Sequence, residues 1–200
     1  MTKENYTAEM IMNVFLEEVT NNFRFLIDDY NFCQSKSKHW YILEYASSKV
    51  KLRVYDDPRC HELSIAIGLI NDKNKRTYGL DVVLEAIFGE GHNRVLGMPQ
   101  DNIDGIRNQI KQLAELVRDN YKPFLKGDIE SYKNLDLVKS RMGERGMRQY
   151  RQEARARAEK ACKDQEYQIA ISLYESIKPH LTQKDISNLE IARQEIQRRH

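Results

Sequence analysis

The chain has 200 residues, of which 40% are hydrophobic and 31% are charged, and its formal net charge is +2. This apolar content is enough for a hydrophobic core and excludes a wholly disordered chain, while the small net charge gives no whole-molecule attraction to nucleic acid or membranes. The sequence lacks an apolar signal segment, a membrane-length apolar run and a C-x-x-C pair among its three cysteines. We therefore expect a cytoplasmic protein with reduced thiols and no membrane partner.

The first predicted element is a helix over residues 8–30. Apolar side chains recur in steps of three and four from Ile11 to Ile27, which is the spacing of an amphipathic helix that packs on a core. Thr7 precedes this pattern, and its hydroxyl oxygen can cap the first turn of the helix.

After the first predicted helix, apolar residues recur with a period of two. This alternation predicts three strands over residues 40–46, 49–55 and 61–70. The middle strand is typical of a half-buried antiparallel strand, because its apolar and basic side chains alternate. These strands predict a three-stranded meander with one face on helices and the other at least partly open.

The last predicted strand has one apolar face and one narrow face. The narrow face carries Ser64, Ala66 and Gly68, which are all small. Another element can therefore approach this face closely.

Two helices are predicted after the strands, over residues 80–88 and 101–124, with a glycine-rich loop between them. The longer helix has one apolar stripe along its whole length, which predicts that it covers the sheet. Asp101 is its predicted N-cap, and Pro123 is expected to end or bend it near Lys122.

These elements predict an α+β domain over residues 1–140, in which helices cover a three-stranded antiparallel meander. A further short helix is expected over residues 129–139. The composition then becomes strongly charged without any strand signal, which predicts a helical tail over residues 141–200. Within this tail, helices are expected over residues 166–178 and from residue 183 onward.

Residue types suited to catalysis or metal binding are present, but their spacing does not favour a reaction centre. Cys60 and His61 are neighbours in a strand and point to opposite faces, so they cannot easily share a metal ion with His39 or act as a nucleophile pair. The loop after Gly89 lacks the residue order of a phosphate-binding loop, and the carboxylates at strand ends, such as Glu62, are typical turn formers. We expect no enzymatic activity, no metal and no cofactor.

Protein binding is the predicted function. The open sheet face offers aromatic and basic side chains, which commonly anchor protein interfaces. The predicted partner-binding residues are Tyr41, Tyr45, Lys51, Arg53 and Tyr55. The helical tail is the other candidate surface, and its apolar faces could also form a dimer.

Arginines in the tail form an alternative site, within a segment over residues 139–163 that carries nine Lys or Arg and three Glu. A row of guanidinium groups can follow a nucleic-acid backbone, dock on an acidic protein or form a solvated helix face, and all three interpretations stay open. Glu144 and Arg148 are spaced to form an ion pair on the helix. The predicted nucleic-acid-binding residues are Arg141, Arg145, Arg148, Arg151 and Arg155.

Residues 154–179 resemble one tetratricopeptide motif. The residues that carry the resemblance are Ala158, Tyr167, Ala170, Tyr174, Ile177 and Pro179. Ala154 stands where the first helix of the motif has an aromatic residue. The resemblance covers a single copy, whereas solenoids need several copies, so it implies either a true repeat or a helical hairpin that borrows the packing of the motif through small residues.

The rest of the chain resembles small bacterial proteins of the immunity type. The resemblance lies in the layout of an N-terminal helix, a meander ending in HELSIAIGLI and a long helix closing with YKPFLKGD. It implies a protein that neutralises a toxin by binding it and that has no active site. We therefore predict a non-enzymatic immunity or adaptor protein, with nucleic-acid binding as the alternative.

Overall fold

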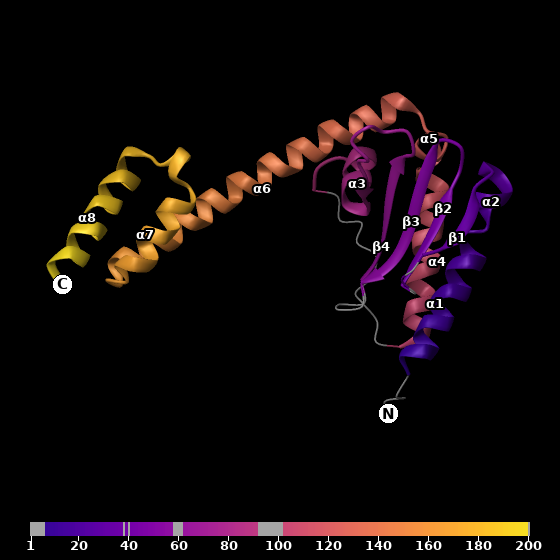
Figure 1. Ribbon diagram of the computed structural model, residues 1–200, viewed down its shortest axis with the longest axis horizontal. Helices are drawn as coiled ribbons and strands as arrows, with labels where there is room; N and C mark the ends of the chain where they lie inside the picture. Colours follow the sequence, from indigo (N-terminus) through magenta and orange to yellow (C-terminus); the bar gives the residue numbers. More distant parts are fainter. Residues whose placement is uncertain (1–6, 38, 40, 58–61, 92–101, 200) are drawn as a thin grey trace. The chain divides into compact units, whose positions relative to one another are not determined.

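The computed structural model (Figure 1) describes residues 7–37, 39, 41–57, 62–91 and 102–199. These residues form eight α-helices and an antiparallel sheet of five strands, so the predicted α+β class is confirmed and the predicted number of strands is wrong. The chain divides into two compact units, Met1–Lys139 and Ser140–His200, and each is described by itself.

The sheet is a meander in which each strand pairs antiparallel with the next one along the chain. Its strands are β1 (Cys33–Lys36), β2 (Ile42–Ala46), β3 (Val50–Asp57), β4 (Glu62–Leu69) and β5 (Tyr78–Gly79). The predicted strands correspond to β2, β3 and β4. The additional strands give little signal in the sequence, because β1 has no alternating apolar residues and β5 has only two residues.

Burial alternates along the central strands, as their sequence pattern predicts. One face of the sheet, called here the covered face, carries fully buried apolar side chains. They include Leu43, Val50, Leu52, Val54, Ile65 and Ile67. Side chains between them, such as Lys51 and Arg53, are half-buried or exposed.

The first predicted helix is divided in two. α1 spans Ala8–Asn22 and α2 spans Phe25–Tyr30, so the expectation of one continuous helix is wrong. Both Phe23 and Phe25 are buried, and their ring centroids lie 6.0 Å apart. A continuous helix would place residues two apart on nearly opposite sides, so the division lets both rings enter the core.

Side-chain caps begin two of the helices. Thr7 Oγ1 accepts a hydrogen bond from a first-turn N–H at 3.2 Å, which confirms the predicted cap of α1. α4 (Ile103–Asn120) is capped by Asn102, whose Oδ1 accepts from the Gly105 N–H at 2.7 Å. Asp101, the residue predicted for this role, lies outside the described residues.

The other two helices of the N-terminal unit follow the sequence pattern closely. α3 (Leu80–Phe88) has the predicted bounds. α4 ends at Asn120, and the short helix α5 (Lys122–Leu125) follows with Pro123 in its first turn. Proline is tolerated there because a first-turn N–H has no intrahelical partner, and the predicted interruption near Lys122 is confirmed.

α1 and α4 lie side by side and pack on the covered face (Figure 1). The Tyr45 hydroxyl of β2 donates to the Val19 carbonyl of α1 at 3.3 Å, and its ring stacks on Phe23 with centroids 6.2 Å apart. An ion pair between Arg107 Nε and Glu18 Oε1, at 3.1 Å, joins α4 to α1. These contacts place the core between the two helices and the sheet.

At Gly68, another part of the backbone lies close against the narrow face predicted for β4. A Cβ atom at this position would collide with the Arg76 carbonyl oxygen and lie 3.3 Å from Thr77 Cγ2. The absence of a side chain therefore lets the segment before β5 lie close against β4, which confirms the expectation of a close approach.

α6 (Ile129–Lys163) is a single helix of 35 residues. The expectation that a short helix ends at residue 139 is therefore wrong. Neither the change of composition nor Gly143 and Gly146 interrupts the helix, because an internal glycine costs only about 1 kcal/mol and preserves the backbone hydrogen bonds.

In the C-terminal unit, the last part of α6 packs with α7 (Tyr167–Ser176) and α8 (Gln183–Arg199). A short 3₁₀ turn at Lys178–His180 separates α7 from α8. Two clusters of buried side chains hold the helices together, and these side chains are Ala158, Tyr174 and Leu189 in one, and Ala161, Ala170 and Ala192 in the other. Within the described ranges, every helix is too short or too polar to cross a membrane.

Candidate partner-binding surfaces

The second face of the sheet carries polar and aromatic side chains that no described helix buries. Residues paired directly across antiparallel strands point to the same side, and the register pairs Ile42 with Tyr55, and Glu44 with Arg53. Lys51 is on the same side because it alternates with the buried Leu52. We define the open face by its five central residues, Ile42, Glu44, Lys51, Arg53 and Tyr55.

An ion-pair cluster lies at the centre of the open face. Glu44 Oε1 lies 2.7 Å from Arg53 Nε, and Glu44 Oε2 lies 2.9 Å from Lys51 Nζ. Burial by itself raises the pKa of Glu44, but hydrogen bonds and charge from Lys51 and Arg53 bring the pKa below its ordinary value. The carboxylate therefore stays ionised at neutral pH and holds both cations in place.

The five predicted partner-binding residues do not share one face. Lys51, Arg53 and Tyr55 lie together on the open face, whereas Tyr45 is 0% exposed on the covered face. Tyr45 therefore cannot contact a partner in this fold, and its inclusion is corrected. Tyr41 directly precedes β2, is half-buried and stacks on His39 with centroids 5.3 Å apart.

Two residues of the open face, Ile42 and Glu44, are missing from the predicted set. Their signal is present in the sequence, since both alternate with Leu43 and Tyr45 along β2. Deciding which half of that alternation is exposed requires the pairing with β3. The pairing is a property of the fold and not of the strand alone.

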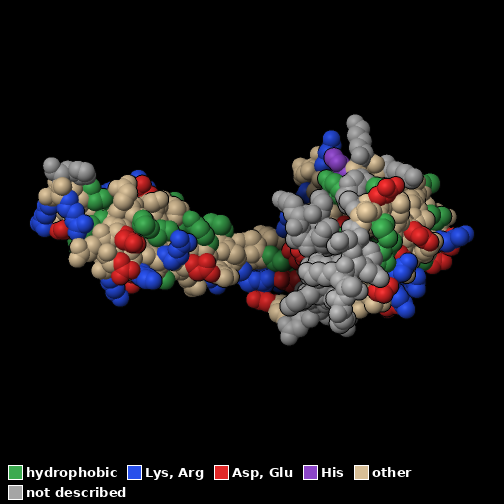
Figure 2. All heavy atoms as spheres, turned by 90° about the horizontal axis from the view of Figure 1, so that it is seen from below, with side chains coloured by type: hydrophobic (Ala, Val, Ile, Leu, Met, Phe, Trp, Pro, Cys, Tyr) green, Lys and Arg blue, Asp and Glu red, His purple; other side chains and the backbone are tan. Residues whose placement is uncertain are grey.

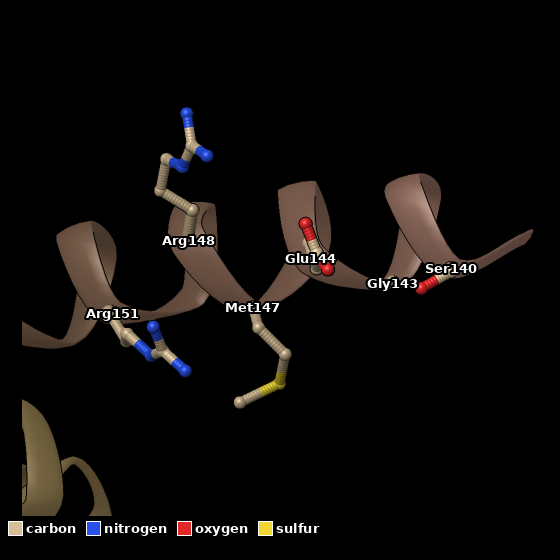
Figure 3. Close-up of a pocket in the computed structure, with 6 residues that line it drawn as sticks. All are labelled: Ser140, Gly143, Glu144, Met147, Arg148 and Arg151. Atoms are coloured by element: carbon tan, nitrogen blue, oxygen red, sulfur yellow. The ribbon is translucent and has the colours of Figure 1, made fainter. Parts of the chain in front are cut away.

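The predicted arginine row is spread over different environments in the C-terminal unit. Arg141 and Arg148 are exposed, while Arg145, Arg151 and Arg155 are half-buried. Figure 3 shows Arg148 pointing away from Arg151 across α6. Figure 2 shows basic and acidic side chains interspersed over the visible side of the C-terminal helices, so the arginines do not form one uninterrupted basic surface.

Arg155 takes part in the packing of the helices. Its Nε lies 2.9 Å from Asp185 Oδ2, and its Nη2 donates to the His180 carbonyl. Asp185 is 1% exposed, and it also accepts a hydrogen bond from the Thr182 N–H at 2.7 Å. A guanidinium held in this way is directed at the α8 N-terminus, so Arg155 is removed from the predicted nucleic-acid surface.

The electrostatics of Asp185 follow from these contacts. Burial by itself raises the pKa of the carboxyl group, but hydrogen bonds from Thr182 and Arg155 and the charge of Arg155 bring the pKa below its ordinary value. The Asp185 N–H donates in return to Thr182 Oγ1 at 3.2 Å, which completes a capping box at the start of α8. The cluster therefore joins α6 to the first turn of α8.

A second charged cluster lies in the N-terminal unit, where the start of α6 meets β5. Asp136 accepts from Arg76 Nη1 at 2.6 Å and from the Tyr78 hydroxyl at 2.7 Å, and Asp72 accepts from Arg76 Nε at 2.9 Å. Burial, followed by the hydrogen bond to Asp136, raises the pKa of Tyr78 above its ordinary value. The tyrosine stays protonated, and the cluster serves to hold β5 against α6.

The described residues give no support for a metal site. Among them, no group of three His, Cys, Asp or Glu side chains is placed to hold a metal ion. Cys60 and His61 lie outside the described residues, as does the glycine-rich loop beyond Gly91.

Comparison of the chain with family models, with curated proteins and with solved structures found no match. The resemblances to a tetratricopeptide motif and to immunity proteins therefore stay predictions.

Proposed function

We propose that this protein acts by binding another protein through the open face of its sheet, without catalysing a reaction. The observation that supports this most strongly is the contrast between the two faces of the sheet. α1 and α4 pack on the covered face, while Arg53 and Tyr55 are exposed or half-buried on the other. Arginine and tyrosine are the side chains that most often anchor protein interfaces.

The ion-pair cluster supports the same proposal. Lys51 and Arg53 are both held by Glu44, so their side chains lose little further conformational freedom when a partner binds. Ordering long side chains at an interface costs about 0.5–1.5 kcal/mol for each one, and a preformed cluster reduces this cost. Ile42 and Tyr55 supply apolar area beside the charges.

A cytoplasmic immunity or adaptor protein is the role that we put forward for this binding activity. An immunity protein must cover a surface of its toxin, and an adaptor must hold its target without altering it. Both roles require an exposed, ordered surface of the kind described for the open face.

The proposal is tested by affinity capture from the native cells with the full chain as bait, followed by mass spectrometry. The variant Arg53→Glu/Tyr55→Ala removes both anchors of the open face. Lys111→Glu/Gln112→Ala is the matched control, because both residues are exposed on α4 and the change of charge is the same. We expect the control to retain a stoichiometric protein that the open-face variant loses, and equal recovery by both variants would contradict the proposal.

Nucleic-acid binding is the second candidate, and it is favoured by the exposure of Arg141 and Arg148. Neither side chain has an ion-pair partner among the described residues. The same capture carried out after nuclease treatment separates the two functions. Loss of the bound material after that treatment, with steep weakening by salt, would favour nucleic acid.

A further inference from the structure

The two ends of the sheet have different surroundings. At one end, β5 is held against α6, because Arg76 and the Tyr78 hydroxyl both donate to Asp136. β1 forms the other end (Figure 1), and β2 is its only strand partner among the described residues. A strand at the end of a sheet presents a row of backbone N–H and C=O groups to its surroundings, and these groups can pair with another strand.

The hydrogen bonds of β2 show which backbone groups of β1 point away from the sheet. Next to the turn between β2 and β3, the Ser47 N–H donates to the Val50 carbonyl at 2.9 Å. Hydrogen-bonded residues alternate along an antiparallel strand. The odd-numbered residues of β2 therefore direct their backbone groups at β3, and the even-numbered residues direct theirs at β1.

The even-numbered residues of β2 are paired with Cys33 and Ser35 of β1. These two residues therefore use their backbone groups within the sheet, whereas Gln34 and Lys36 direct theirs outward. In the part of the chain that the structure describes, the backbone N–H and C=O of Gln34 have no hydrogen-bond partner. We call the outward backbone groups of Gln34 and Lys36 the β1 edge.

The neighbouring residues define the limits of the β1 edge. Before it, the Phe32 N–H donates to the Leu26 carbonyl of α2 at 3.0 Å, so α2 occupies the preceding outward position. Beside it, Cys33 and Ser35 are exposed and lie on the same side of the sheet as Glu44 of the open face. A strand added at the β1 edge would continue the open face, and these small side chains leave room for large side chains on that strand.

The β1 sequence carries little of what usually protects the end of a sheet. Such strands commonly contain proline or several charged residues, which discourage pairing with another strand. The four residues of β1 include no proline, and Lys36 is their only charged residue. The strand is therefore suited to accept a partner backbone.

We propose that the β1 edge binds an extended segment of a partner protein, which adds to the sheet as a further strand. Donors and acceptors at strand spacing are matched by another polypeptide backbone, and this selects the class of ligand. A second copy of the chain is disfavoured, because it would bring its own α2 to the same edge, whereas an extended segment requires space for one backbone. The interaction goes beyond the proposed function, since it uses backbone groups of β1 and not the side chains of the open face.

The binding test uses the full chain and two labelled peptides of eight residues. The first peptide alternates large residues, tyrosine and valine, with threonine, and has a lysine at each end for solubility. The second has the same sequence with two adjacent central residues N-methylated, which blocks both edges of the peptide because adjacent N–H groups point to opposite sides. Fluorescence anisotropy gives both affinities, and we expect the methylated peptide to bind at least about tenfold more weakly, since it loses more than one hydrogen bond.

A matched pair of variants at one position locates the site. Gln34→Pro and Gln34→Ala both remove the side-chain contact with Thr20, in which Gln34 Nε2 donates to Oγ1 at 3.0 Å. Only proline also removes the outward N–H, and it is tolerated at the end of a sheet where that N–H is not used by the neighbouring strand. We expect Gln34→Pro to weaken the first peptide by about fivefold or more, as for loss of one hydrogen bond, and Gln34→Ala to change its affinity by less than about twofold.

Amide hydrogen exchange of the unaltered protein, followed by nuclear magnetic resonance, provides a second measurement that does not depend on the folding of a variant. We expect the first peptide to slow exchange at Gln34 and Lys36. Exchange at Cys33 and Ser35 should change much less, because their amides already bond to β2. This alternation is a signature of strand addition that contact through side chains would not produce.

Each competing explanation predicts a different outcome. Absence of binding, equal binding of both peptides, equal affinity of the two Gln34 variants or uniform slowing of exchange along β1 would overturn the proposal. A dimer in analytical ultracentrifugation that Gln34→Pro dissociates would assign the β1 edge to a second copy of the chain. Arg53→Glu/Tyr55→Ala should change peptide affinity by less than about twofold, because β3 lies about 14 Å from an added strand. Failure of the open-face proposal is therefore distinguishable from failure of this one.

Discussion

The two units of this protein bury different kinds of side chains in their cores. The N-terminal unit buries large side chains such as Phe15, Phe23 and Tyr45, each at most 1% exposed. The C-terminal unit buries mainly alanines around Tyr174. Because hydrophobic stabilisation scales with the apolar area removed from water, the first unit gains more from each buried residue than the second.

Because the C-terminal unit has the smaller core, its polar contacts matter more for its stability. Alanines allow the helices to approach closely, but each one buries little area. The cluster of Arg155, Asp185 and Thr182 supplies directional contacts between α6 and α8 that an alanine interface lacks. We therefore expect the first unit to be most sensitive to loss of apolar volume and the second to loss of this cluster.

The largest expected effect is that of Phe23→Ala in the N-terminal unit. Truncating a fully buried phenylalanine typically costs about 3–5 kcal/mol, because transfer energy is lost and a cavity remains. Urea unfolding measures the loss, and hydrogen exchange read by mass spectrometry locates it. Ile27→Ala is the control, since Ile27 is 38% exposed. If hydrogen exchange became faster in α7 and α8 to the same extent as in α1, the expected difference between the two units would be contradicted.

Asp185→Ala is expected to have the next largest effect, and to act on the C-terminal unit. It leaves Arg155 without its carboxylate and removes one half of the capping box. We therefore expect the free energy of unfolding of this unit to fall by about 2–3 kcal/mol. The value lies below that for a fully buried pair because the Arg155 side chain is 28% exposed. Asp164→Ala removes an exposed carboxylate directly after α6 and provides the comparison. If exchange in α8 were the same in both variants, the polar cluster would not be the main support of this unit.

Acidification is expected to give a smaller effect on the same cluster. The pKa of Asp185 is lower in the folded protein than its ordinary value, so the stability that it contributes is present above the unfolded pKa of about 4 and is lost as pH falls through the folded pKa. Protonation removes the charge but keeps an oxygen that can accept a hydrogen bond, so the loss should be less than that of Asp185→Ala. Hydrogen exchange of α8 between neutral and acidic pH measures it, and Asp185→Asn should reduce the pH dependence of α8 while leaving that of α1 unchanged.

Local patterns predicted much of the fold. The alternation in β3, the period of α3 and the cap at Thr7 each depend on residues within one or two turns or along one strand. Such patterns are read directly, because backbone geometry fixes which neighbours share a face. β1 and β5 carry almost no pattern of their own, and they form because an adjacent strand offers its free edge.

The candidate surfaces were predicted less well, and the errors have particular causes. Tyr45 was assigned to the open face although it alternates in step with the apolar Leu43, and only the pairing of β2 with β3 decides that this half of the alternation is buried. The contact of Arg155 with Asp185 joins residues 30 positions apart, and no local pattern indicates it.

The sequence alone determined the α+β class, the positions of the central strands and the helical character of the C-terminal residues, because these follow from hydrophobic periodicity and capping. Only the tertiary structure decided that Glu44 holds both Lys51 and Arg53, that Phe23 and Phe25 enter one core, and that Ala158 and Ala161 of α6 pack with α7 and α8. The physical reason is that periodicity is a local property of the backbone. Pairing between distant segments instead depends on which packing of the whole chain has the lowest free energy.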